Sequence, residues 1–241
     1  MSPILTINNL HKSFGKVAAV HDLSFEVEPR EILGIIGPNG AGKTTAFNLI
    51  TGEIKPDKGE VIFGGKDVTY DPTYRKCRMG IARTYQIPKP FVNMTVLENI
   101  LVGAIYGGSE GYRQSREKCE EILEKTKLKA KRNSMAGSLP LLDRKRLELA
   151  KALATDPTIL LVDEVAGGLT ESEVEEVLEI IHSVRKEGVT VLWVEHIIMA
   201  MQKGPDRLLV MNFGRSLFCG RPEQAFKSEE VQRIYLGAEE D

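Results

Sequence analysis

The stretch Gly37-Pro38-Asn39-Gly40-Ala41-Gly42-Lys43-Thr44 decides the fold of this chain. It matches the pattern GxxxxGKT and stands between an apolar, strand-like run, Ile32–Ile36, and a helix-like run, Thr45–Thr51. Glycines let successive backbone N–H groups converge on phosphate oxygens, the following helix adds its positive end, and Lys43 adds a point charge. A glycine-rich turn that spells the motif by chance is the alternative, but the flanking strand and helix argue against it. The stretch predicts a nucleoside triphosphate site with the Thr44 hydroxyl on a magnesium ion. The candidate nucleotide contacts are Gly37, Pro38, Asn39, Gly40, Ala41, Gly42, Lys43, Thr44 and Thr45.

Composition limits the classes of protein to consider. The chain has 241 residues, of which 42% are hydrophobic, so it can bury a substantial core in one large domain. The 32 basic and 34 acidic residues give a net charge of −2. A nucleic-acid-binding protein needs a basic arm or patch to neutralise phosphates, and we find none in the sequence. We therefore expect no nucleic-acid partner.

The cysteines and the apolar runs bear on the cellular compartment. Cys77, Cys119 and Cys219 are odd in number, widely spaced and without a CxxC pair, so they predict neither a disulfide framework nor a zinc site. We see no secretion signal and no apolar run near the roughly 18 residues that span a bilayer. A reducing cytoplasm fits these features, and any role at a membrane is expected to come through a partner.

The order of predicted elements indicates an α/β fold. Strand-like runs come first, a mainly helical stretch follows, and after Leu139 helices and strands alternate, which predicts parallel strands with helical crossovers. The expected strands are Ile4–Leu10, Leu23–Val27, Ile32–Ile36, Val61–Phe63, Ile159–Val162 and Val189–Val194. The expected helices include an apolar one through Tyr106 that begins at a Thr95/Glu98 capping box, an amphipathic one over Glu117–Thr126, one through Ala154, one from Glu171, and two short ones within Pro222–Leu236.

A second candidate site lies at the end of a strand. Ile159–Val162 is apolar and is followed by Asp163 and Glu164, so both acids are expected at the carboxyl edge of a parallel sheet, where α/β folds bind ligands. Acids often end strands simply because they favour turns. Together with the Lys43 loop, however, the pattern predicts that Asp163 holds magnesium through water. We expect Glu164 to orient and polarise the water that attacks the terminal phosphate.

With both motifs in place, essentially the whole chain resembles the ATP-binding subunit of ATP-binding-cassette (ABC) transporters. The resemblance implies a P-loop NTPase core, residues 1–87 and 139–241, with an antiparallel β subdomain and an inserted helical subdomain, residues 88–138. It also implies that Phe14 stacks on adenine, that Gln86 reaches magnesium, and that His196 contacts the γ-phosphate. Each of these residues also has a purely structural interpretation: Phe14 could pack in the core, Gln86 could be solvated in a loop, and His196 could be a structural residue at a strand end.

Within this family, the runs Gly80–Gln86 and Met94–Asn99 resemble the ATPases of branched-chain amino-acid uptake systems, as does Ile234–Gly237. The resemblance implies an importer for branched-chain or related amino acids or amides. The ATPase would lie at the cytoplasmic face of the cell membrane, bound to membrane permease subunits and linked only indirectly to a solute-binding protein. The segment Pro88–Asn99, with Phe91 and Met94, is expected to receive a permease helix, although both side chains could equally be core.

One stretch departs from the family. Where members carry an LSGGQ-like signature that acts on the partner subunit's nucleotide, this chain has Leu139-Pro140-Leu141-Leu142-Asp143. Branched leucines would keep the backbone away from a phosphate, and we expect Asp143 to add negative charge near that anion. We therefore predict a weak signature and a heterodimer with a second ABC ATPase whose signature is intact.

Three other functions stay open. The first is a nucleotide-gated ABC-type module with little turnover, which the altered signature suggests but the retention of Glu164 and His196 argues against. The second is an ABC-type ATPase not coupled to transport. The third is a P-loop ATPase acting on nucleic acid, which would predict a basic stripe or long coiled-coil heptads that we do not find.

Overall fold

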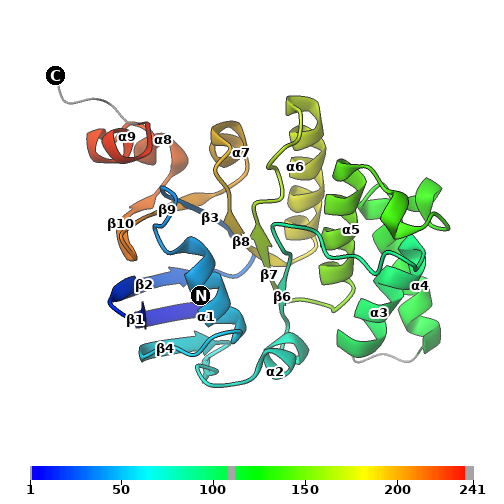
Figure 1. Cartoon of the computed structure of the whole chain (residues 1–241), viewed down its shortest axis with the longest axis horizontal. Coiled ribbons are helices and arrows are strands. Elements are labelled where there is room, and N and C mark those ends of the chain that lie inside the picture. The colour runs from blue at the N-terminus through cyan, green and yellow to red at the C-terminus, as the bar shows by residue number, and fades with distance from the viewer. Residues whose placement is uncertain (1, 108–111, 237–241) are drawn as a thin grey trace. The chain divides into compact units, whose positions relative to one another are not determined.

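A computed structural model describes residues 2–107 and 112–236 of the chain (Figure 1). It divides the chain into two compact units. Unit 1 comprises Met1–Thr73 and Thr190–Asp241, and unit 2 comprises Tyr74–Val189. Each unit is described separately. Within the described ranges, no helix combines the length and the apolar character needed to cross a bilayer.

Unit 1 holds an antiparallel sheet of order β2-β1-β4-β5. Its long strands alternate buried and exposed positions, as expected for a sheet with one face on the core. The strands are β1 (Leu5–Phe14), β2 (Val17–Val27), β4 (Lys58–Phe63) and β5 (Lys66–Asp67).

A second set of strands in unit 1 carries the phosphate loop. The order is β10-β9-β3-β8, in which β3 runs parallel to β8 and β9, and β10 pairs antiparallel with β9. All five residues of β3 are buried, as are all five of β8, because parallel strands are covered on both faces. The elements are β3 (Ile32–Ile36), β8 (Thr190–Val194), β9 (Arg207–Asn212), β10 (Arg215–Gly220), α1 (Lys43–Thr51), α7 (Ile198–Lys203), α8 (Pro222–Ala225) and α9 (Glu229–Leu236).

Unit 2 is mainly helical, and Figure 1 shows α3, α4 and α5 in green, packed side by side. Two parallel strands, β6 and β7, complete it. The helices are α2 (Thr73–Arg78), α3 (Val96–Gly107), α4 (Tyr112–Lys125), α5 (Leu141–Leu153) and α6 (Glu171–Lys186), the strands are β6 (Ile81–Arg83) and β7 (Ile159–Asp163), and short 3-10 turns span Lys129–Lys131 and Ala136–Ser138.

Most predicted elements are confirmed, with shifted ends. The helix expected from Glu171 buries one apolar face, and its Thr170/Glu173 capping box is formed. The Thr95/Glu98 box ahead of α3 is formed as well. Of the run Ile234–Gly237, Gly237 lies outside the described residues. The sequence reasoning missed α2, α7, β6 and the hairpin of β9 and β10. The proposed division at residues 87 and 139 stays a prediction.

Candidate functional site

The phosphate loop of unit 1 has the backbone that its glycines predict. It connects β3 to α1, with Gly37, Gly40 and Gly42 at φ values of 156°, 84° and 96°. A Cβ atom on Gly37 would lie 2.2 Å from the Met211 carbonyl oxygen, and one on Gly42 would lie 2.3 Å from the Ala19 carbonyl oxygen. Neither position can carry a side chain without moving backbone, so these glycines are needed for the loop to sit where it does.

Lys43 begins α1 and is buried, with its ammonium group folded back on the loop. Its Nζ donates to the Gly37 carbonyl at 2.7 Å and to the Pro38 carbonyl at 3.1 Å. Thr44 is exposed and Thr45 is half-buried. In the described chain no side chain caps the N-terminus of α1 and no acid lies in its first turn. An uncapped helix start beside a buried cation favours an anion.

Phe14 ends β1 and is 52% exposed, which excludes the core alternative. The strand end that presents it is held by Asp57, whose carboxylate accepts from Lys12 Nζ at 2.8 Å and from Ser13 N at 2.7 Å. The Lys12 ammonium and then the Ser13 amide lower the pKa of Asp57. An exposed ring on an anchored strand end can stack on a planar base.

His196 lies in unit 1 just beyond β8, whose Val194 pairs with Ile35 of β3. Because the carboxyl ends of adjacent parallel strands meet at one edge, His196 and the start of the phosphate loop share that edge. Its neighbour Glu195 is fully buried, and Oε1 of Glu195 lies 3.3 Å from His196 Nδ1 and accepts from His196 N at 2.8 Å. Glu195 therefore anchors the backbone at His196 and lies beside the ring nitrogen Nδ1. The sequence reasoning missed Glu195, although an acid directly after an apolar strand was a usable signal.

Asp163 lies in unit 2 at the end of β7 and is 3% exposed. Its Oδ2 accepts from Arg83 Nη2 at 2.7 Å, and its backbone N donates to the Thr84 hydroxyl at 3.0 Å. Its other oxygen, Oδ1, is buried and has no hydrogen-bond partner in the described part of the chain. An orphaned carboxylate oxygen fits a hard cation or its bound water, so the carboxylate suits the predicted role at magnesium. The Arg83 contact was not foreseen.

Glu164 and Gln86, which were predicted separately, are hydrogen-bonded to each other. Gln86 Nε2 donates to Glu164 Oε2 at 2.5 Å, although the residues are 78 positions apart. Glu164 has φ 44°, a left-handed conformation that is unfavourable for a residue with a Cβ atom. The buried Lys145 donates from Nζ to the Glu164 carbonyl at 3.1 Å and holds it there. Strained backbone retained at a strand end points to a functional position.

The altered signature forms the N-terminus of α5, with Pro140 as the N-cap residue. Leu139 is buried and Leu141 is 46% exposed. The expectation that Asp143 adds a free negative charge is wrong. Asp143 is 3% exposed, accepts from Arg146 Nη1 at 3.0 Å, and pairs with Lys131. Its charge is neutralised within unit 2.

The segment Pro88–Asn99 is anchored by a buried asparagine. The Asn99 side chain accepts from Phe91 N at 2.8 Å and donates to the Phe91 and Thr95 carbonyls at 3.1 and 2.9 Å. Phe91 is 49% exposed, so it is not core, and Met94 is half-buried. The segment that was predicted to receive a permease helix is thus a hydrogen-bonded loop and the first turn of α3, with the exposed side chain of Phe91 on the loop.

These features define a P-loop nucleoside triphosphatase: a glycine-rich loop between a parallel strand and a helix, a lysine at the helix start, and acids at a strand end. The family model described as ABC transporter matches residues 20–167. The chain belongs to the ABC transporter family, as an ATP-binding and ATP-hydrolysing subunit that works with membrane permease subunits.

Similar proteins agree on the fold and on the family. The high-affinity branched-chain amino acid transport ATP-binding protein LivG of Escherichia coli (strain K12) is 36% identical, with 98% of each chain covered. The lipopolysaccharide export system ATP-binding protein LptB of Haemophilus influenzae is 33% identical, with 97% of each covered. A crystal structure of a nucleotide-free ATP-binding cassette from an ABC transporter has a TM-score of 0.89 and 32% identity, covering 97% of this chain and 99% of that one. A cassette in its ADP conformation has a TM-score of 0.90 and 32% identity, covering 98% and 100%. The predicted fold class is confirmed.

Proposed function

We propose that this ATPase energises an importer for branched-chain or related amino acids or amides, at the cytoplasmic face of the cell membrane. Support comes from the likeness to LivG and from the runs Gly80–Gln86 and Met94–Asn99. The likeness to LptB, which is named for export, is nearly as strong, so the direction of transport needs its own test. Co-purification from membranes would identify the permease. Uptake of labelled leucine and valine by vesicles with the purified complex would then test import, and ATP-dependent loss of lipopolysaccharide from the membrane without uptake would contradict it.

The residue roles follow from the groups that each unit offers. In unit 1, Lys43 and the loop amides hold the phosphates, Phe14 stacks on the base, and His196 contacts the terminal phosphate. In unit 2, Glu164 orients the attacking water and polarises it by accepting its proton, while Gln86 fixes the carboxylate. Thr44, Gln86 and Asp163 would hold Mg²⁺, which neutralises phosphate charge when bound.

The single observation that carries this assignment is the hydrogen bond of 2.5 Å between Gln86 and Glu164. It unites two residues that were assigned to the site on separate grounds, the strand-end pattern for one and the family likeness for the other. Because Gln86 is a neutral side chain, this contact positions the Glu164 carboxylate without adding a charge beside it.

The decisive variant is Glu164→Gln. We expect it to bind Mg·ATP as the wild type does while hydrolysis falls by about 10²–10⁴-fold, the usual contribution of a general base. Glu171→Gln, an exposed residue of the same unit, is the matched control and should hydrolyse normally. Steady-state phosphate release checks both, and undiminished release by Glu164→Gln would reject the role. No release from the wild type under any condition would favour the nucleotide-gated module instead.

We further propose a heterodimer as the working unit. The branched residues of Leu139–Asp143 leave little room for a phosphate, whereas the phosphate loop of the same chain is intact. Turnover should therefore rise when the chain is mixed with a related subunit that bears LSGGQ. Equal turnover per site, alone and mixed, would contradict the proposal.

A further inference from the structure

The turn between β9 and β10, Asn212–Arg215, contacts the phosphate loop through backbone atoms. Gly214 N donates to the Ala41 carbonyl at 3.0 Å. On its other side, the Gly214 carbonyl accepts from His21 N of β2 at 2.9 Å. One residue of the turn thus joins the loop to β2, all within unit 1.

The space around Gly214 admits no side chain. Its φ is +76°, and a Cβ atom there would lie 2.8 Å from the Ala19 carbonyl oxygen and 2.9 Å from Val20 Cα. These are backbone atoms of β2, which cannot rotate away as a side chain can. A methyl group on residue 214 must therefore push the turn away from β2. This movement would disturb the hydrogen bond from Gly214 N to the Ala41 carbonyl.

The same hairpin supports both ends of the phosphate loop. The Met211 carbonyl lies where a side chain on Gly37 would be, and Gly214 Cα lies 3.4 Å from the Cβ position of Gly42, which the Ala19 carbonyl also blocks. Backbone atoms of β2 and of the β9–β10 hairpin therefore lie directly against the phosphate loop. The direction of the loop's N–H groups depends on these backbone contacts.

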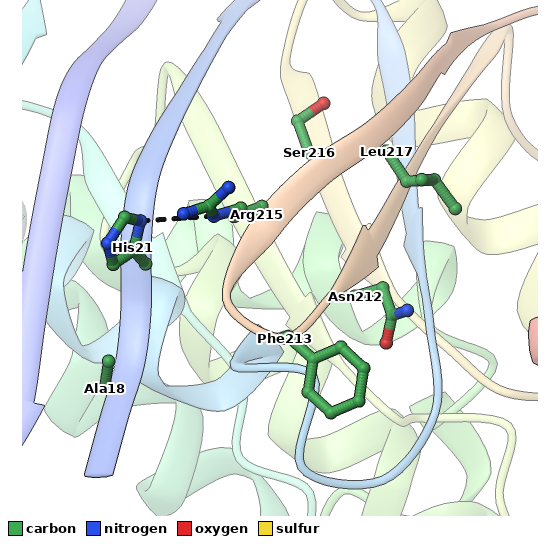
Figure 2. Close-up of a pocket in the computed structure, with 7 residues that line it drawn as sticks. All are labelled: Ala18, His21, Asn212, Phe213, Arg215, Ser216 and Leu217. Carbon is green, nitrogen blue, oxygen red and sulfur yellow. Dashed lines mark hydrogen bonds between the residues drawn. The ribbon is translucent and has the colours of Figure 1, made fainter. Parts of the chain in front are cut away.

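Among the described residues, no side chain of the turn makes a hydrogen bond to the phosphate loop. Figure 2 shows the Arg215 side chain directed to His21, where Nε donates to Nδ1 at 3.2 Å. With Ala18 and Ser216, the side chains of Asn212 and Phe213 line an open cavity of about 520 Å³, and Phe213 is 82% exposed. Contact with the phosphate loop is thus a property of the backbone at Gly214.

We propose that Gly214 is a positioning residue for nucleotide binding: it holds Ala41 and Gly42 so that the loop amides point at the phosphates. Those amides contact phosphates in the ground state and in the transition state alike. Displacing them removes uniform binding, which raises KM and Kd for Mg·ATP and leaves kcat nearly unchanged.

The test is Gly214→Ala, with Gly65→Ala as matched control. Gly65 has the same φ of +76° and nothing within 4 Å of its Cβ position, so it carries the left-handed strain without the clash. We expect Gly214→Ala to raise the Kd for Mg·ATP, by calorimetry, about tenfold or more, with kcat within about threefold of wild type. Gly65→Ala should lower Tm by about 2–4 °C and leave Kd within about twofold. Phe213→Ala, which keeps the turn backbone, should also leave Kd unchanged.

Two results would overturn the proposal: folded Gly214→Ala that binds Mg·ATP like wild type, or equal weakening in Gly65→Ala. If Gly214→Ala does not fold, hydrogen exchange of the wild type decides. Nucleotide that binds the closed phosphate loop suppresses local opening of the loop. If the turn is coupled to the loop, local opening of the turn must be suppressed as well. Mg·ATP should therefore slow exchange in peptides covering residues 212–215 as well as 37–44. Protection of 37–44 alone would overturn the inference.

Discussion

Two junctions between a loop and a helix N-terminus differ sharply in this chain. At the start of α1 in unit 1, Gly40 and Gly42 adopt left-handed backbone and Lys43 supplies a buried cation. At the start of α5 in unit 2, Pro140 is extended, Leu141 projects outward, and the acid of the first turn is Asp143. Among the described residues neither helix start has a side-chain cap, so both offer the same partial positive charge.

The difference teaches that a helix dipole does not by itself make a phosphate site. Close approach of the backbone requires residues without Cβ atoms, and a fixed cation adds what the dipole lacks. At α5 the acid of the first turn is already neutralised by Arg146 and Lys131, and the Arg144 guanidinium donates to the carbonyls of Leu139 and Gly137. The first junction is therefore expected to bind nucleotide strongly and the second to bind phosphate poorly.

The largest expected effect comes from removing the cation at the first junction. Lys43→Ala should weaken Mg·ATP binding by about 100-fold, because a buried charge-assisted donor is lost at a triphosphate. Lys66→Ala, an exposed lysine of the same unit, is the control and should leave affinity unchanged. Titration calorimetry measures both. If Lys43→Ala bound as tightly as wild type, the contrast between the junctions would rest on glycines alone.

Next in size is the buried acid of the second junction. Asp143→Asn should lower the free energy of unfolding by about 2 kcal/mol, since Arg146 and Lys131 lose a buried carboxylate. We expect a smaller loss of stability than is usual for a broken buried ion pair, because Lys131 is 42% exposed and its interaction with Asp143 is screened by solvent. Arg146 also pairs with Glu176, and Lys127 pairs with both Glu176 and the exposed Glu179. Glu179→Gln removes this exposed end of the charge network and should leave the urea midpoint unchanged. Equal midpoints for Asp143→Asn and wild type would show that the acid is not structural.

The structure of the phosphate loop before α1 could be predicted from the sequence, whereas the contacts at the start of α5 could be predicted only in part. The phosphate loop is encoded by contiguous residues, and the acids Asp163 and Glu164 follow an apolar strand directly. The pairing of Asp143 with Lys131 depends on how a loop folds back over 12 positions, and that of Arg83 with Asp163 spans 80. No local pattern specifies such contacts. The β9–β10 hairpin was missed although the apolar run Leu208–Met211, followed by Asn212 and Gly214, was a usable signal. Its contact with the phosphate loop is made by backbone atoms and is specified by no local pattern.

A smaller effect should follow from making the second junction resemble the first. The combined variant Pro140→Ser, Leu141→Gly, Leu142→Gly keeps Asp143 and its pairs while opening the backbone. We expect about a tenfold rise in ATP turnover of the chain alone, since one added transition-state donor is worth at least that. Leu141→Ala with Leu142→Ala, which trims both side chains without glycine, is the control. No rise with an unchanged Tm would mean that steric exclusion at Leu141 and Leu142 is not what limits turnover.

The smallest effect concerns a third helix start, that of α6, whose N-terminal amides are capped by the side chain of Thr170. The Thr170 backbone N–H and hydroxyl both donate to Glu173, and these bonds lower the pKa of that carboxyl from its ordinary 4.5. A lowered folded-state pKa means stabilisation that is full above the unfolded value and is lost as pH falls through the folded one. Thr170→Ala removes the N-cap hydroxyl that accepts from Glu173 N and should lower the free energy of unfolding by about 1 kcal/mol at pH 7. The part of this gap that comes from the hydroxyl's bond to Glu173 should be lost below pH 4.5 as Glu173 becomes protonated. Urea unfolding at pH 7 and pH 3 measures the gap, with Thr95→Ala as the parallel variant because Glu98 is held in the same way ahead of α3. A gap independent of pH would show that the bond from the threonine hydroxyl to Glu173 adds nothing to stability, because the backbone N–H of residue 170 can donate to Glu173 in both proteins.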